Sequence, residues 1–415
     1  LSLILALALA GCGDSAEELT PLEEARAMLA DGDGLGAEVV LRQMLADGAA
    51  QDQVAAYLGE AELQQGELVE ARRWLGEGRF TQDTAGHGFH MLGRLELRSG
   101  NLPAAGQAFD RAYASIPDNP DLWVDIGRLR YRGGEQKQAI EASMRAVELG
   151  PQDPEALLLR AQLVRDGEGL AAAIPWFEAG LEVAPDNLDL LGDYAATLGD
   201  LGRAKDMLVV IRHMATIDDR NPRLFYLQAV LAARGGEFAL ARSLLSRAGS
   251  AVSENPAGLL LSGVIDVENG NYQSAAQTLD RLVTMQPDNR PARELLARAI
   301  ALGLNDGEFG YRFGDQAQMK SASPYMMQLA GRSLEGLGRR DEAAILLDRA
   351  TQPRNANLLA VEALTSLSVA EARRDQGGAA IQALVRGKIR AGNAAAAIAD
   401  AESFRRSRTQ VASDI

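Results

Sequence analysis

Prolines recur along this chain at a spacing of 34 residues. Two interleaved series share that period, one at Pro117, Pro151, Pro185 and Pro287 and the other at Pro120, Pro154, Pro222, Pro256 and Pro324. A fixed period of this length is typical of chains built from repeated units, each of which buries its apolar face against its neighbours. The series set a phase in which units begin at residues 18, 52, 86, 120, 154, 188, 222, 256, 290 and 324.

Four further places recur within the unit, independently of proline. The eighth is Gly or Ala in all ten units, the fifteenth is Gly in eight, the twentieth is Ala in eight, and the twenty-fourth is usually large and apolar. Small residues at eight and twenty let two helices approach closely, and glycine at fifteen can adopt the left-handed conformation that ends the first helix. Proline at the boundary ends the second helix or begins the next. The pattern predicts that each unit is an antiparallel helical hairpin.

This unit resembles the tetratricopeptide repeat. The copy that begins at Gly86 carries the resemblance most fully, with Phe89, Leu92, Gly93, Ala105, Phe109, Ala112 and Pro117 in the order of that repeat. A chain that is 47% hydrophobic but only 5% aromatic also favours close-packed helices over β-sheet layers. The resemblance implies an all-α fold, an α-solenoid of tetratricopeptide helical hairpins that form a right-handed superhelix. Ten units cover residues 18–357.

The phase breaks after residue 357. We expect residues 358–415 to form C-terminal helices, a degenerate or out-of-phase repeat. The segment 371–408 carries eight basic and four acidic residues, which reverses the balance of the whole chain. It is either a cap or the start of further repeats beyond Ile415.

The N-terminus predicts a lipid anchor. Residues 1–10 are an apolar run too short to span a bilayer but of the length found in signal peptides. Leu9, Ala10, Gly11 and Cys12 resemble the lipobox of bacterial lipoproteins. The resemblance implies that residues 1–11 are a signal peptide whose start is missing, that Cys12 is acylated and that 12–17 form a lipidated linker. The alternative is a buried helix that ends at an inert thiol.

The same resemblance implies a location. The mature chain would be held at a membrane of the bacterial envelope and would face the periplasm. Because Gly13 rather than an aspartate follows the cysteine, the outer membrane is favoured over the inner membrane.

Composition excludes several functions. A net charge of −15 disfavours nucleic acid, and a single cysteine rules out an intramolecular disulfide and a cysteine-rich metal site. His87 and His90 share a helix face but have no third ligand at a suitable spacing, so no metal site is expected. The chain has no nucleophile motif, phosphate-binding loop or dinucleotide fingerprint. We therefore expect no catalysis, no cofactor and no small-molecule substrate.

In the tetratricopeptide family the first helix of each unit lines an inner groove, mainly with its second, fifth, ninth and twelfth places. Here those places supply a polar section and an apolar section, with His90, Arg94, Arg128 and Tyr131 in the first and Tyr226, Val230, Leu260, Val264 and Val267 in the second. The arginines could hold partner carboxylates, and the apolar places could hold a helix or an extended peptide. Alternatively, the arginines pair with neighbouring Asp and Glu, and the apolar side chains pack between helices.

The ninth unit departs most from the pattern. Gly307, Gly310 and Gly314 interrupt its second helix, each at about 1 kcal/mol relative to alanine. Phe309 and Phe313 occupy the twentieth and twenty-fourth places, which predicts a bulky core with Tyr311 facing outward. The alternative is a loosened segment that presents these aromatics to a partner.

These features favour a protein-interaction scaffold, a lipoprotein that supports assembly or export of an envelope component. The stretches "GAEVVLRQML" and "YLGEAELQQGELVEARRWL" resemble repeat lipoproteins of exopolysaccharide and exosortase-linked systems. Lipoproteins of pilus biogenesis and of outer-membrane protein insertion are alternatives. A third is the repeat region of a larger enzyme whose catalytic domain lies beyond Ile415.

Overall fold

The computed structural model describes residues 19–303 and 305–350 of this chain. Within these residues every regular element is a helix. The chain divides into two compact bodies between Val210 and Ile211, within one helix. The expected signal peptide (1–11), linker (12–17) and C-terminal region (358–415) lie outside the described residues, as do the last residues of the tenth unit.

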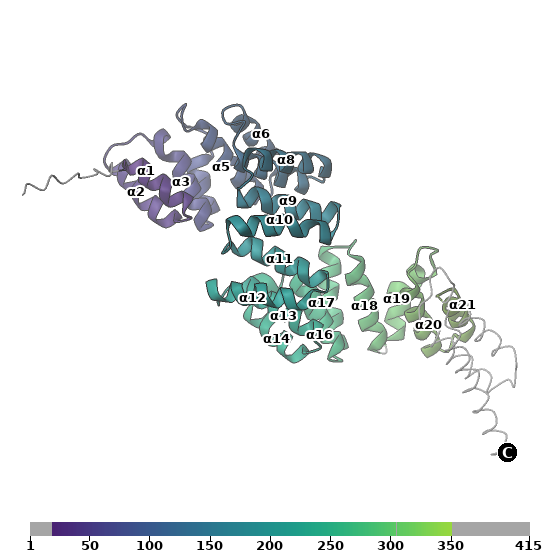
Figure 1. Ribbon diagram of the computed structural model, residues 1–415. Coiled ribbons are helices and arrows are strands. Elements are labelled where there is room, and N and C mark those ends of the chain that lie inside the picture. Colours follow the sequence, from purple (N-terminus) through teal and green to yellow (C-terminus); the bar gives the residue numbers. More distant parts are fainter. Residues whose placement is uncertain (1–18, 304, 351–415) are drawn as a thin grey trace, which may run out of the picture. The chain divides into compact units, whose positions relative to one another are not determined.

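The first body consists of consecutive helices that lie side by side in pairs (Figure 1). Its helices are α1 (Pro21–Ala30), α2 (Gly34–Ala46), α3 (Gln51–Gln65), α4 (Leu68–Leu75), α5 (Ala85–Arg98), α6 (Leu102–Tyr113), α7 (Pro120–Arg132), α8 (Gln136–Leu149), α9 (Pro154–Gly167), α10 (Leu170–Val183), α11 (Leu188–Asp200) and the first half of α12 (Ala204–Ile217).

The second body continues the same alternation after α12. Its helices are α13 (Pro222–Arg234), α14 (Phe238–Arg247), α15 (Ser250–Ser253), α16 (Pro256–Glu268), α17 (Tyr272–Met285), α18 (Arg290–Leu302), α19 (Asp306–Gln318), α20 (Pro324–Gly336) and α21 (Arg340–Ala350). The short α15 follows Gly249, whose φ of 78° ends α14 early. Ten hairpins thus occupy the described residues in the predicted phase, and the chain is an α-solenoid.

Capping residues and prolines start the first helix of most units. In α7, Asn119 accepts a hydrogen bond from the Leu122 amide at 2.9 Å, and Pro120 is the first helical residue. Such a cap satisfies an amide that the helix itself leaves without a partner, and proline has no amide to satisfy there. The predicted role of the boundary prolines is confirmed.

Glycine at the fifteenth place ends the first helix in a left-handed conformation. All eight have φ between 76° and 81°, namely Gly32, Gly66, Gly100, Gly134, Gly202, Gly236, Gly270 and Gly338. In the fifth unit, where Glu168 stands at this place, Gly169 takes over with φ 107°. Only glycine adopts this conformation without strain, so the turn fixes the residue type.

The eighth and twenty-fourth places pack directly against each other. A Cβ built on Gly93 would lie 2.2 Å from the ring of Phe109, and one built on Gly59 would lie 2.3 Å from Leu75. The eight alanines at the twentieth place are fully buried beside this contact. The small-residue pattern therefore reflects close helix packing, as predicted.

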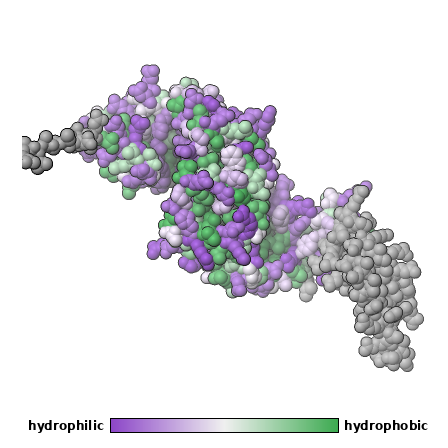
Figure 2. All heavy atoms as spheres, viewed as in Figure 1, coloured by the Kyte–Doolittle hydropathy of each residue, from purple (hydrophilic) through white to green (hydrophobic). Residues whose placement is uncertain are grey.

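Hydrophilic side chains cover much of the face seen in Figure 2, and hydrophobic ones show between them. In the described part of the chain, no helix has the length and apolar character needed to cross a membrane.

Candidate binding surface

Long polar side chains link the first helices of consecutive hairpins at a constant interval. Gln64 Nε2 donates to the Leu29 carbonyl at 2.8 Å, Arg98 Nη1 to the Leu63 carbonyl at 2.5 Å, and Arg132 Nη1 to the Leu97 carbonyl at 2.9 Å. Each donor is 35 residues after its acceptor, so the thirteenth place of one unit reaches the twelfth place of the unit before it. Each of these carbonyls also accepts a bond from the glycine amide three residues later, so the side chain supplies its second hydrogen bond. The side-chain bonds tie α1, α3, α5 and α7 in sequence.

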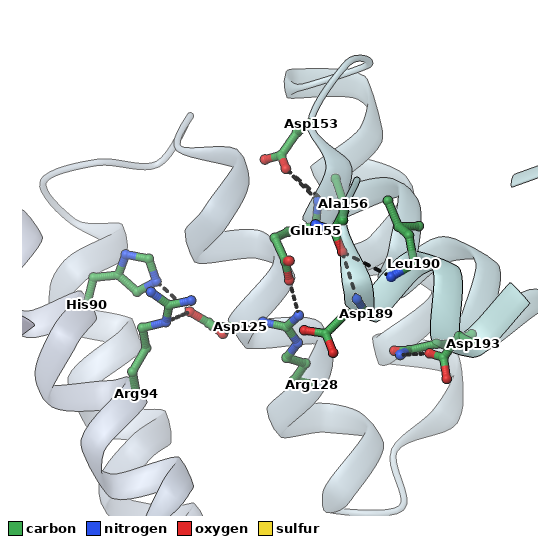
Figure 3. A network of polar contacts seen from close by, with 12 residues as sticks. His90, Arg94, Asp125, Arg128, Asp153, Glu155, Ala156, Asp189, Leu190 and Asp193 are labelled. Atoms are coloured by element: carbon green, nitrogen blue, oxygen red, sulfur yellow. Dashed lines mark hydrogen bonds and ion pairs between the residues drawn. The ribbon is translucent and has the colours of Figure 1, made fainter. Parts of the chain in front are cut away.

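A buried carboxylate lies between α5 and α7. Asp125 is 3% exposed, and three nitrogen-bearing side chains, those of His90, Arg94 and Arg128, converge on it from the two helices (Figure 3). Its Oδ2 lies 2.8 Å from His90 Nε2 and 2.8 Å from Arg94 Nε, and its Oδ1 lies 3.3 Å from Arg128 Nη1. Burial alone would raise the pKa of Asp125, but the hydrogen bond from His90 and the charges of Arg94 and Arg128 outweigh it and lower the pKa to about 2.

The polar contacts continue from α7 into α9 and α11. Arg128 Nη2 lies 2.5 Å from Glu155 Oε2. This contact is drawn as a dashed line in Figure 3. The Tyr131 hydroxyl donates to Asp166 Oδ2 at 2.5 Å. Gln162 Nε2 donates to Asp193 Oδ2 at 2.6 Å. We call this set the polar ladder, and its members are His90, Arg94, Asp125, Arg128, Tyr131, Glu155, Gln162, Asp166 and Asp193.

The ladder corrects part of the sequence prediction. His90 is 2% exposed, so a partner cannot contact it without rearrangement. Arg94 and Arg128 pair with acidic side chains of the same chain, as the alternative interpretation of the sequence predicted. The Arg94 side chain is nevertheless 33% exposed, and that of Arg128 is 30% exposed. Tyr131 is 43% exposed. Three of the four predicted polar residues therefore lie together at the surface.

The predicted apolar section is more covered than expected. Tyr226 and Val230 are half-buried against the core that includes Ala229 and Leu261, and Leu260 and Val264 are also half-buried. Val267 is 3% exposed and belongs to the core, which corrects its assignment to the surface. The exposed part of this section is thus limited to the edges of Tyr226, Val230, Leu260 and Val264.

The second helix of the ninth unit is continuous despite its glycines. Phe309 and Phe313 are 1% and 5% exposed, and their rings lie 5.5 Å apart in the core. The proposal that these two rings are presented to a partner is wrong. Tyr311 is 92% exposed, as expected if Phe309 and Phe313 form the core and Tyr311 faces outward.

The two histidines considered for a metal have other partners. His87 Nε2 lies 2.8 Å from Glu60 Oε2, and the His87 ring stacks on Tyr57 with centroids 5.0 Å apart. Across residues 19–303 and 305–350, no group of three or more His, Cys, Asp or Glu side chains is arranged to hold a metal ion.

Sequence reasoning missed the acidic members of the ladder. Asp125 stands at the sixth place, which the groove pattern does not include, and Asp166 stands at the thirteenth. A usable signal was the interval of 35 residues that separates His90 from Asp125 and Tyr131 from Asp166. That interval joins equivalent turns of neighbouring first helices.

The hairpins, their glycine turns and their packed small residues define a tetratricopeptide-repeat solenoid. A family model described as tetratricopeptide repeat matches residues 90–154 and 124–187, and a second of the same description matches 232–299. The chain therefore carries tetratricopeptide repeats in both bodies.

Two known proteins illustrate the likeness. Cellulose synthase 2 operon protein C of Komagataeibacter xylinus is 28% identical over 242 residues, which are 53% of this chain and 18% of that protein. The chain thus matches less than a fifth of this relative's length. The human IFIT1 dimer with m7Gppp-AAAA has a TM-score of 0.54 at 16% identity and covers 91% of this chain and 95% of its own. At that identity the likeness to IFIT1 shows the fold alone.

Proposed function

We propose that this chain is a non-catalytic scaffold, a lipid-anchored tetratricopeptide-repeat protein of the bacterial envelope that supports exopolysaccharide secretion. The similarity to cellulose synthase 2 operon protein C carries the proposal, because it links this repeat sequence to a polysaccharide-producing system. The fold is consistent with that role, since stacked hairpins offer an extended surface rather than an enclosed site.

The face that bears the polar ladder is the proposed contact surface. Its helices are held in register by the 35-residue hydrogen bonds, so Arg94, Arg128 and Tyr131 keep fixed positions before a partner arrives. A partner carboxylate would share these guanidinium groups with Asp125 and Glu155, and a partner donor would compete for the same acids. Such a surface selects protein or peptide partners that carry both signs of charge.

Cys12 is the proposed anchor. Two or more acyl chains hold a protein stably at a membrane, whereas one chain holds it only marginally. Anchored there, the chain would face the periplasm, and Gly13 after the cysteine favours the outer membrane.

Two linked assays test this function in the native bacterium. In a strain that lacks this chain, we expect secreted exopolysaccharide to fall and to recover with the wild-type chain but not with Cys12→Ser. Palmitate labelling of the wild-type chain should disappear in Cys12→Ser. Unchanged secretion in the deletion strain would refute the role in export, and unchanged labelling would refute the anchor.

A further inference from the structure

The ninth hairpin carries a charged residue at the fourth place of its unit, where each of the nine other units has an apolar residue. The fourth place of the units is occupied by Pro21, Ala55, Phe89, Trp123, Leu157, Leu191, Phe225, Leu259, Arg293 and Met327. In the tenth unit Met327 is 2% exposed at this place, which shows that the position lies in the packed interior of the hairpin. Arg293, on α18, is half-buried and brings its guanidinium to the edge of that environment, with the Nε atom buried.

The Arg293 side chain has no partner among residues 19–303 and 305–350. Its Nε is buried and makes no hydrogen bond, and no ion pair joins it to an acid there. Neighbouring Arg290, by contrast, pairs with Glu294 at 3.0 Å and is largely exposed. An uncompensated cation with a buried N–H is costly, so the site favours an anion that neutralises it.

Arg293 lines a pocket of about 360 Å³ between α18, the end of α19 and the start of α20. The other polar side chains of its wall are those of Arg290, Glu294, Gln316, Ser321 and Ser323, and Met319 and Met326 supply an apolar part. The wall therefore combines two guanidinium groups, two hydroxyls and one carboxylate, that of Glu294, with space for more than a single small ion. Because Glu294 already pairs with Arg290, the positive charge of Arg293 is the one left for an anion.

The junction beside this pocket is also unusual. Every other junction between consecutive hairpins contains an acid, namely Asp47, Asp83, Asp118, Asp153, Asp186, Asp218, Glu254 and Asp288. The junction 319–323 reads Met-Lys-Ser-Ala-Ser and contains none. Arg349 adds a further positive charge, because it donates to the carbonyls of Gln318 and Met319 at 3.2 and 3.0 Å. The junction that contains no acidic residue is therefore the one that lies beside Arg293.

We propose that the Arg293 pocket binds a carboxylate side chain of an acidic peptide segment. A guanidinium presents paired donors that match the two oxygens of a carboxylate, and the hydroxyls of Ser321 and Ser323 can donate to the same group. The volume accommodates the stem of a glutamate as well as its head. The segment belongs to a partner protein, because residues 351–415 of this chain carry nine basic and six acidic side chains. This inference does not depend on the envelope function.

Binding is tested on the full chain with N-acetylated, C-amidated triglutamate, and the matched neutral probe is triglutamine. Isothermal titration calorimetry gives affinity, and hydrogen exchange by mass spectrometry locates the contact. We expect triglutamate to slow exchange at residues 316–327 and triglutamine to have no effect. Arg293→Met should weaken triglutamate binding about tenfold or more, whereas Arg281→Met, at an exposed arginine of α17 outside the pocket, should not. Equal binding of both probes, or unchanged binding by Arg293→Met, would overturn the proposal.

The same variants identify the source of the carboxylate. Methionine is already accommodated at this place in the tenth unit, so Arg293→Met should fold. Faster exchange across residues 351–415 in Arg293→Met than in Arg281→Met would assign the carboxylate to the chain itself and would contradict a partner protein as its source. Unchanged exchange there, with triglutamate binding lost, assigns it to a partner. A lower melting temperature without either effect would show that Arg293 is only structural and would contradict the proposal.

Discussion

His90 Nε2 lies 2.8 Å from Asp125 Oδ2, and this buried pair joins the first helices of two consecutive hairpins. The pair links sequence positions 35 residues apart, the same interval that the arginine-to-carbonyl bonds use. Consecutive hairpins are therefore fixed by polar contacts as well as by apolar packing.

Asp125 should make the stability of the first body depend on acid pH. Its pKa is about 2 in the folded chain and 3.8 ordinarily, so its contribution of about 2 kcal/mol is present above pH 4 and is lost as the pH falls toward 2. Asp125→Asn should lower the free energy of unfolding by about 2 kcal/mol at pH 6 and flatten the decline between pH 4 and 2. Denaturant unfolding at each pH measures both effects.

The control for this prediction is Asp118→Asn. The Asp118 side chain is 75% exposed in its pair with Arg145, so its removal should change stability by less than about 1 kcal/mol. Equal losses in the two variants would contradict the special role of Asp125.

Two glycine-to-alanine substitutions should change the stability of their helices in opposite directions. Gly93→Ala places a Cβ 2.2 Å from Phe109 and should destabilise its hairpin by about 1–3 kcal/mol. Gly307→Ala in α19 meets nothing within 4 Å and should stabilise that helix by about 0.5–1 kcal/mol. Local hydrogen exchange in α5 and α19 reports each change separately, which suits a repeat protein that need not unfold in one step. A destabilising Gly307→Ala would mean that α19 requires its glycines.

Arg132 should stabilise the end of α5 from the neighbouring hairpin. Arg132→Met removes the 2.9 Å bond to the Leu97 carbonyl but keeps much of the aliphatic packing, so we expect a loss of about 1–2 kcal/mol. Exchange at residues 97–101 should rise. Arg130→Met is the matched control, because Arg130 pairs with Glu135 of its own unit, so its loss should leave those amides unchanged. The same rise in both variants would show that a general loss of charge is responsible.

Tyr194 should be among the last tyrosines to ionise. Burial and the hydrogen bond that its hydroxyl donates to Glu178 at 2.9 Å raise its pKa to about 12. Because the unfolded chain ionises near pH 10, the folded state should lose stability as the pH rises above 10. Subtracting the absorbance titration of Tyr194→Phe from that of the wild type isolates the ionisation of the Tyr194 hydroxyl. Glu178→Gln should lower the pH at the midpoint of that ionisation. A midpoint near 10 in the wild type would refute the contact.

The repeat fold was predictable because its constraints are local. The residue at the fifteenth place must adopt a positive φ, and the residue at the eighth place, such as Gly93, must leave room for Phe109 of its own hairpin. Both constraints therefore fix the residue type at regular positions in the sequence. The ladder was predicted only in part. Arg94 and Arg128 were identified from their register, but their charge is shared with Asp125 across a neighbouring helix, and that pairing depends on how two units stack. The burial of His90 follows from the same stacking.

The central claim is that the ladder face of the first body receives a protein of the export apparatus. Photo-crosslinking in living cells tests it with p-benzoylphenylalanine at Tyr131, which is 43% exposed on α7, and at Tyr113, which is 46% exposed on α6 and serves as the matched control. We predict that Tyr131 gives an adduct identified by mass spectrometry as the outer-membrane porin of the polysaccharide system, and that Tyr113 does not. No adduct at Tyr131, equal adducts at both positions, or an adduct with a pilus secretin or an insertion barrel would contradict the claim.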